Sequence, residues 1–76
     1  MIYYTIEFQT SDTGSATVYA YDPSEFEHPK EEALSKFHTI LSFAVKGNVP
    51  YHGAMVVSGD GVLEACQFYD HTGGGE

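Results

Sequence analysis

The sequence predicts an α+β fold in which four strands and one helix follow in the order β-β-α-β-β. Three observations predict it. Two short runs near the N-terminus alternate along the chain, one longer segment repeats apolar residues every three or four positions, and an Asp-Gly turn joins two apolar runs near the C-terminus. The expected architecture is a four-stranded antiparallel sheet with one helix packed on one face.

The first two strands are expected over 2–9 and 16–21, joined by the turn-forming segment TSDTGS. Successive side chains of a strand point to opposite faces of the sheet. We expect the apolar side of this hairpin to pack against the helix and the other side to stay open. The apolar side comprises Ile2, Tyr4, Ile6, Phe8, Ala16, Val18 and Ala20.

A short turn over 23–27 is expected before the helix, because Asp22 is a good capping residue and Pro29 fits only the first turn of a helix. The helix should end near Lys46, with Gly47 in the left-handed conformation that closes many helices. Its apolar stripe, the expected core, comprises Ala33, Leu34, Phe37, Ile40, Leu41 and Ala44.

The last two strands are expected over 52–58 and 62–69, on either side of the turn sequence GDG. The turn can be two or three residues long, and a one-residue slip moves every side chain to the opposite face. The register is therefore left open, and so are the faces of Met55, Cys66 and Phe68.

Seventy-six residues make one domain, expected over 1–70, with a flexible glycine-rich tail over 71–76. Three Lys and Arg oppose eleven Asp and Glu, giving a formal net charge of −8. This charge repels phosphate, which disfavours direct binding to nucleic acid or anionic membranes and favours a protein partner with a basic surface. One cysteine, no long apolar run and no signal-peptide pattern predict a cytoplasmic protein.

Tyr3, Tyr19 and Tyr21 fall on the side of the first hairpin that we expect to be open, beside Glu7. One interpretation is that tyrosines are good strand residues that pair across the hairpin. The other is a binding face for a protein partner or a second copy of the chain, since tyrosine is enriched at interfaces. A base-stacking platform is disfavoured, because no basic residue lies on either strand.

Five carboxylates gather at the expected start of the helix, and Lys30 alone opposes them. They can be ordinary acids that complement the helix dipole. Alternatively they form a carboxylate array that imitates phosphate spacing and binds a basic groove. The residues are Asp22, Glu25, Glu27, Glu31 and Glu32.

Catalytic and metal chemistry find little support in the sequence. His28, His38, His52 and His71 show no metal-ligand spacing, and Cys66 lies in an apolar strand without a nearby cation, the setting of an unreactive thiol. No nucleophile, phosphate-loop or dinucleotide motif is present. We therefore expect no enzyme activity, no cofactor and no metal site.

The segment YDPSEFEHPKEEALSKFHTILS, followed by the GDG hairpin, resembles small proteins of phages and mobile elements of Gram-positive bacteria. Pro29 departs from that pattern. The resemblance covers about 2–69 and implies a candidate class, the inhibitors of host defence that include anti-CRISPR proteins. It transfers no site residues.

Two functional hypotheses follow. The first is a small acidic inhibitor that binds a basic groove of a host nucleic-acid-handling protein in the bacterial cytoplasm, using the tyrosines for packing and the acids for steering. The second is a homodimeric structural or accessory protein whose open sheet face is buried between two copies.

Overall fold

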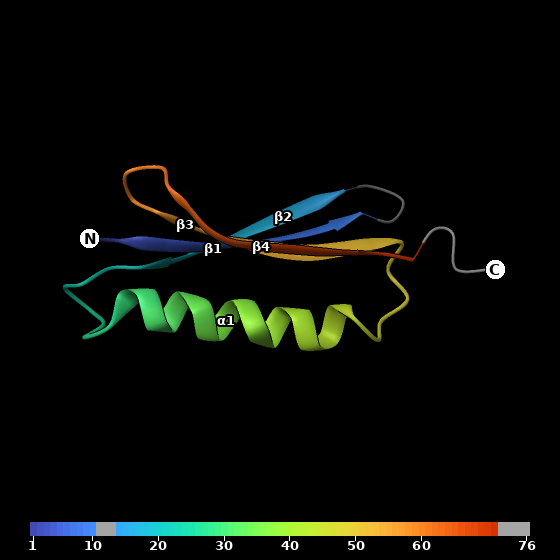
Figure 1. Cartoon of the computed structure of the whole chain (residues 1–76), viewed down its shortest axis with the longest axis horizontal. Coiled ribbons are helices and arrows are strands. Elements are labelled where there is room, and N and C mark those ends of the chain that lie inside the picture. Colours follow the sequence, from blue (N-terminus) through green and yellow to red (C-terminus); the bar gives the residue numbers. More distant parts are fainter. Residues whose placement is uncertain (11–13, 72–76) are drawn as a thin grey trace.

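A computed structural model of the chain describes residues 1–10 and 14–71. It contains β1 (Tyr3–Thr10), β2 (Ser15–Tyr21), α1 (Pro29–Ala44), β3 (Tyr51–Ser58) and β4 (Leu63–Asp70). Figure 1 shows two layers, with α1 running along one face of a single sheet. The predicted order, β-β-α-β-β with an antiparallel sheet, is confirmed.

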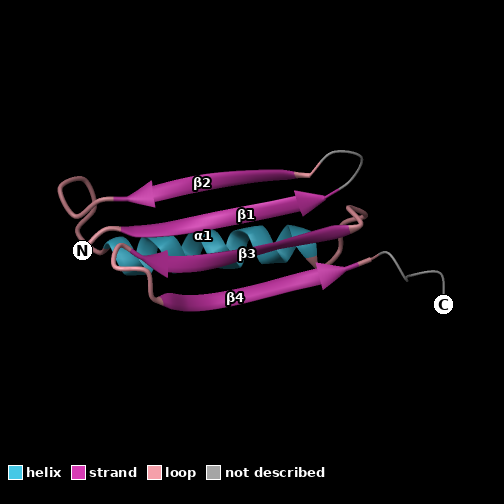
Figure 2. Cartoon of the chain, turned by 90° about the horizontal axis from the view of Figure 1, so that it is seen from above, coloured by secondary structure: helices cyan, strands magenta, loops and turns pink. Residues whose placement is uncertain are grey.

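The sheet has the spatial order β2-β1-β3-β4, and all three neighbouring pairs are antiparallel (Figure 2). The central strands β1 and β3 pair directly, so that Thr5 lies opposite Val56 and Ile6 opposite Met55. A bulge between Val56 and Val57 shifts the register of β4. The two hairpins thus join side by side, and β2 and β4 are the outer strands.

The β2–α1 connection follows the predicted turn and delayed helix start. The Asp22 carboxylate accepts a hydrogen bond from the Ser24 N–H at 2.8 Å, and the Asp22 carbonyl accepts bonds from the Glu25 and Phe26 N–H groups, each at 2.9 Å. Asp22 therefore closes its own turn. His28 precedes α1 without a side-chain cap, and Pro29 occupies the first turn as expected.

The C-terminus of α1 differs from the prediction. The helix ends at Ala44, Val45 follows in right-handed helical conformation, and Gly47 does not have a positive φ. The Ala44 carbonyl instead accepts a hydrogen bond from His71 Nε2 at 2.9 Å. His71 also donates its N–H to the Pro50 carbonyl at 2.7 Å. His71, the first residue of the predicted tail over 71–76, is therefore bonded to the domain; residues 72–76, like turn residues 11–13, lie outside the described part.

The turn between β3 and β4 is closed by Ser58. Its N–H donates to the Val62 carbonyl at 2.9 Å, and its hydroxyl bonds the Asp60 carboxylate and accepts from the Val62 N–H. Gly61 has a φ of 90°, the left-handed region that glycine enters at no steric cost. The predicted hairpin is confirmed, and its register is now set.

The core lies between α1 and the sheet face that we expected to be open. Thr5 is fully buried and its hydroxyl donates to the Ala33 carbonyl of α1 at 2.7 Å. The buried apolar residues are Ala33, Phe37, Ile40, Ala44, Ala54 and Val56. The predicted stripe of α1 does form the core, with Leu34 and Leu41 at its margins, but its predicted partners on the sheet are wrong.

The reversal has a steric cause. The residues at the centre of the covered face are small or medium-sized, namely Thr5, Ala54, Val56 and Ala65. They allow the helix backbone to approach closely enough for the Thr5–Ala33 hydrogen bond. The larger Ile6 and Phe8 point to the opposite face, where Val18, an expected core residue, is 58% exposed.

Candidate protein interface

The tyrosines proposed for partner binding lie under the helix. Tyr3, Tyr19 and Tyr21 pack against the core between α1 and the sheet. Lys36 of α1 places its ammonium 4.3 Å from the centre of the Tyr19 ring. The prediction that these three rings form an open binding face is therefore wrong, because α1 covers the side of the hairpin that carries them.

Tyr21 packs the β2–α1 turn against the layer of tyrosines beneath α1. Its ring meets the Phe26 ring edge to face, with centroids 5.1 Å apart. Partial burial raises the pKa of the Tyr21 phenol, and the nearby Glu32 carboxylate and Tyr19 raise it further. The environment therefore favours the neutral phenol, as expected for a packing residue.

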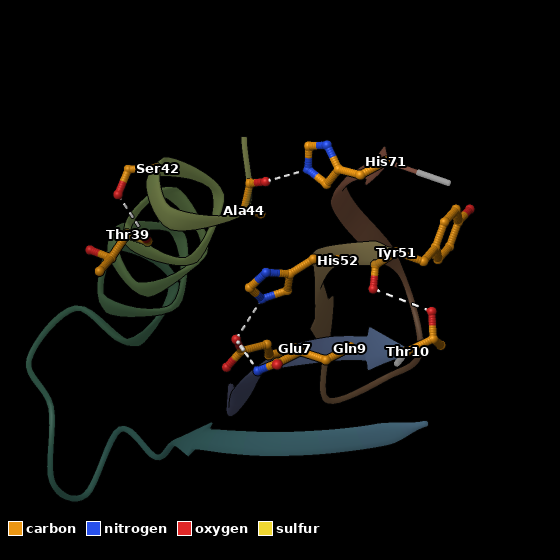
Figure 3. Close-up of polar contacts among 9 residues, drawn as sticks. All are labelled: Glu7, Gln9, Thr10, Thr39, Ser42, Ala44, Tyr51, His52 and His71. Atoms are coloured by element: carbon orange, nitrogen blue, oxygen red, sulfur yellow. Dashed lines mark hydrogen bonds and ion pairs between the residues drawn. The ribbon is translucent and has the colours of Figure 1, made fainter. Parts of the chain in front are cut away.

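Glu7, the fourth residue predicted on the open face, forms a half-buried polar cluster at the C-terminal end of α1 (Figure 3). Its Oε2 accepts from Gln9 Nε2 at 3.0 Å and lies 2.8 Å from His52 Nε2. His52 is only 7% exposed. The Glu7 carboxylate is therefore used in a contact within the fold, and it lies apart from the acids at the start of the helix.

The five acids of the β2–α1 region remain at the surface. Glu25, Glu27, Glu31 and Glu32 are exposed. Hydrogen bonds from Ser24 lower the pKa of the Asp22 carboxyl. The five acids are thus accessible to a partner, but they lie on the helix side of the molecule.

The opposite sheet face is uncovered and almost entirely apolar. Strand pairing aligns its residues in three rows of four across β2, β1, β3 and β4. The rows are Ala16, Phe8, Gly53 and Phe68; Val18, Ile6, Met55 and Cys66; and Ala20, Tyr4, Val57 and Leu63. We call these twelve residues the open face. None is charged, and the Tyr4 hydroxyl and Cys66 thiol are the only polar side-chain groups among them.

One end of the open face is aromatic. The Phe68 ring lies 5.7 Å from the Phe8 ring and is stacked on the Tyr51 ring at 5.6 Å, centroid to centroid. A Cβ placed on Gly53 would run into the Phe68 ring and the Gln67 carbonyl, so only glycine leaves room for this arrangement. Phe68 thereby extends the apolar surface across β3 from β4 to β1.

The charged groups of the neighbouring strand positions lie on the helix side or at the margin of the open face. Glu64, the extra residue at the bulge, pairs with Lys30 at the start of α1 at 3.3 Å. Glu7 pairs with His52 on the helix side. Asp70 lies at the margin of the open face, opposite Tyr51. The twelve-residue face is consequently free of the charge that the rest of the surface carries.

Small-molecule and metal sites are not evident within residues 1–10 and 14–71, which hold neither a pocket nor a cluster of three metal-ligating side chains. His52 and His71 bond Glu7 and Ala44 separately (Figure 3). In the same residues no helix combines the length and hydropathy needed to cross a membrane.

Comparison of the chain with protein-family models, with curated proteins and with solved structures found no match.

Proposed function

We propose that this chain is a protein-binding module whose binding surface is the open face. The observation that carries the proposal is the absence of any charge on twelve adjacent residues of one sheet face in a chain of net charge −8. Uncovered apolar patches larger than a few hundred Å² mark interaction sites on most proteins.

The shape of the face supports the same proposal. Val18 and Leu63, at its two edges, are 58% and 57% exposed. Tyr4, Ile6 and Phe8 along β1 are only half-buried, against neighbours in their own sheet. A partner laid on the sheet would contact all four strands and remove these side chains from water, a gain of about 25 cal/mol per Å² of apolar surface before association costs.

The test compares three forms of the tagged chain in affinity capture from the cell that encodes it. The unaltered chain and Phe43→Lys, which changes a 66% exposed apolar residue on α1, should retain the same proteins. The face variant, Val18→Lys with Leu63→Lys, should lose them. Identical capture by all three forms would reject the open face as the binding surface.

A second candidate function uses the opposite side of the molecule. The exposed acids Glu25, Glu27, Glu31 and Glu32 favour a basic partner, and this is the surface that an inhibitor of a host nucleic-acid-handling protein would use. This candidate keeps the phage or mobile-element origin that the sequence resemblance implies. Tyr3, Tyr19 and Tyr21 no longer contribute to it, since they lie beneath α1.

The two candidates separate in one experiment on a captured partner. Glu25→Gln, Glu27→Gln and Glu31→Gln together should slow association with a basic partner and weaken its salt dependence, because exposed charges steer encounter. The face variant should instead speed dissociation of a partner held on the open face. An unaltered association rate in the triple variant would leave these residues as ordinary helix-start acids.

A further inference from the structure

The core of the single chain holds only two large apolar side chains, and several others lie outside it. Of the six buried apolar residues in the described part of the chain, three are alanines, and Phe37 and Ile40 are the two large ones. The open face meanwhile holds Ile6, Phe8 and Phe68. A chain near this size rarely reaches a comfortable stability from one such core, and small domains commonly gain burial by association. The fold therefore lacks a second apolar layer.

We propose that a second copy of this chain supplies that layer, so that two open faces pack together in an α/β/β/α dimer. This inference rests on the proposed function and names its partner. A face with no charge imposes no electrostatic barrier on its own copy. Asp70 lies at the margin of this face, outside its twelve residues. The exposed acids Glu25, Glu27, Glu31 and Glu32 lie on the helix side, and the two helix layers would stand more than about 20 Å apart across both sheets. That separation exceeds the screening length of about 8 Å at physiological ionic strength.

The available area fits a weak, reversible dimer. The three rows of the open face span about six residues of each strand. With about 3.3 Å per residue and about 4.8 Å between strands, the face measures roughly 380 Å². Two faces would bury about 760 Å² in total, the size of a weak, transient interface.

The distribution of side-chain size indicates how the copies would align. β2 presents the small Ala16 and Ala20 at one edge, whereas β4 presents the larger Phe68 and Leu63 at the other. A twofold axis parallel to the strands, between β1 and β3, sets β2 of one copy against β4 of the other. Small side chains then face large ones, and Val18 faces Cys66 of the second copy. An axis across the strands would set Phe68 against Leu63 and leave the alanines facing each other.

Sedimentation equilibrium of the full chain over a dilution series tests the dimer. The expected mass is about twice the 8.3 kDa of one chain, falling toward one chain on dilution. The face variant, Val18→Lys with Leu63→Lys, should raise the dissociation constant by roughly tenfold or more, since it buries unpaired ammonium groups. Phe43→Lys, the matched control on α1, should leave the constant unchanged.

A mass of one chain at every concentration would overturn the dimer, and so would a dimer weakened by Phe43→Lys but not by the face variant. If the face variant does not fold, the unaltered chain alone still tests whether the dimer exists. Its melting temperature should rise with protein concentration, because unfolding separates the copies. A concentration-independent melting temperature would overturn the proposal.

The two proposals fail in different ways. A monomer whose captured proteins are lost in the face variant would reject the second copy as occupant and keep the open face as a binding surface. A monomer whose captured proteins are unaffected by the face variant would reject both.

Discussion

At the scale of single residues, the polar contacts under α1 are specific and few. Glu7 is the centre of one, because its carboxylate meets both Gln9 and the nearly buried His52 (Figure 3). Thr5 is the centre of another, through its bond to the Ala33 carbonyl. No buried side-chain nitrogen or oxygen of the described residues lacks a hydrogen-bond partner. Both contacts lie on the side of β1 that the helix covers.

Replacing Glu7 tests this role. Glu7→Ala leaves the His52 ring beneath the helix without its partner, and we expect the free energy of unfolding to fall by about 1–3 kcal/mol. Glu27→Ala, which removes an exposed carboxylate, should change it by less than about 0.5 kcal/mol. Urea denaturation measures both. Equal effects would show that the Glu7–His52 contact is not a stabilising part of the fold.

Tyr21 gives a prediction in the alkaline range. Burial, Glu32 and Tyr19 raise its pKa above the ordinary value of 10.0, so the folded chain holds the phenol proton more tightly than the unfolded chain. The resulting stability is complete below that value and is lost as the pH rises through the folded pKa. The unfolding free energy of Tyr21→Phe should therefore fall less between pH about 9 and about 11. The same fall in both proteins would contradict this environment for Tyr21.

At the scale of elements, close packing of α1 on the sheet depends on small side chains. Ala33 is fully buried, and its carbonyl lies 2.7 Å from the Thr5 hydroxyl. Ala33→Leu must push the helix outward or distort neighbouring rotamers, so we expect a loss of about 1–3 kcal/mol. Ser35→Leu, at an exposed position of the same helix, is the control and should be neutral. Denaturation midpoints that move equally would refute close helix–sheet contact at Ala33.

Local patterns in the sequence predicted the elements well. Pro29 in the first turn, the apolar stripe through Phe37 and Ile40, and the turn at Gly61 depend on neighbours along the chain, and all are present in the structure. The helix terminus was different, since His71 lies 27 residues from the Ala44 carbonyl that it bonds. No rule about the last turn of a helix would have found it.

The choice of covered face could not be predicted from alternation alone. Both sides of β1 carry an aromatic residue, Tyr3 on one and Tyr4 on the other, so the rule that the more apolar side faces the helix pointed the wrong way. A usable signal was side-chain size, because Thr5 and the small residues of β3 let a helix approach. This size pattern can be recognised only once the β1–β3 pairing is known, because the pairing places Thr5 opposite Val56. The open face was missed for the same reason.

At the scale of the whole molecule, the chain has two unlike sides. The helix side carries Glu25, Glu27, Glu31 and Glu32 at the surface, and the sheet side carries the twelve uncharged residues of the open face (Figures 1 and 2). A dimer through the open face would display both acidic helix sides outward. The two candidate functions are therefore compatible, since a dimer would offer two acidic surfaces to a basic partner.

If the open face is where this chain meets a partner, and the partner is a second copy, side chains of this face must lie close to those of the other copy. Isotope-filtered nuclear Overhauser spectroscopy on a mixture of labelled and unlabelled full chains tests it most directly. A dimer through the open face predicts transfer between copies that links β2 with β4, in particular the Ala20 methyl of one copy with the Leu63 methyls of the other. Transfer between copies confined to α1, or no transfer between copies at a concentration where the protein sediments as a dimer, would contradict it, and so would a mass of one chain at every concentration.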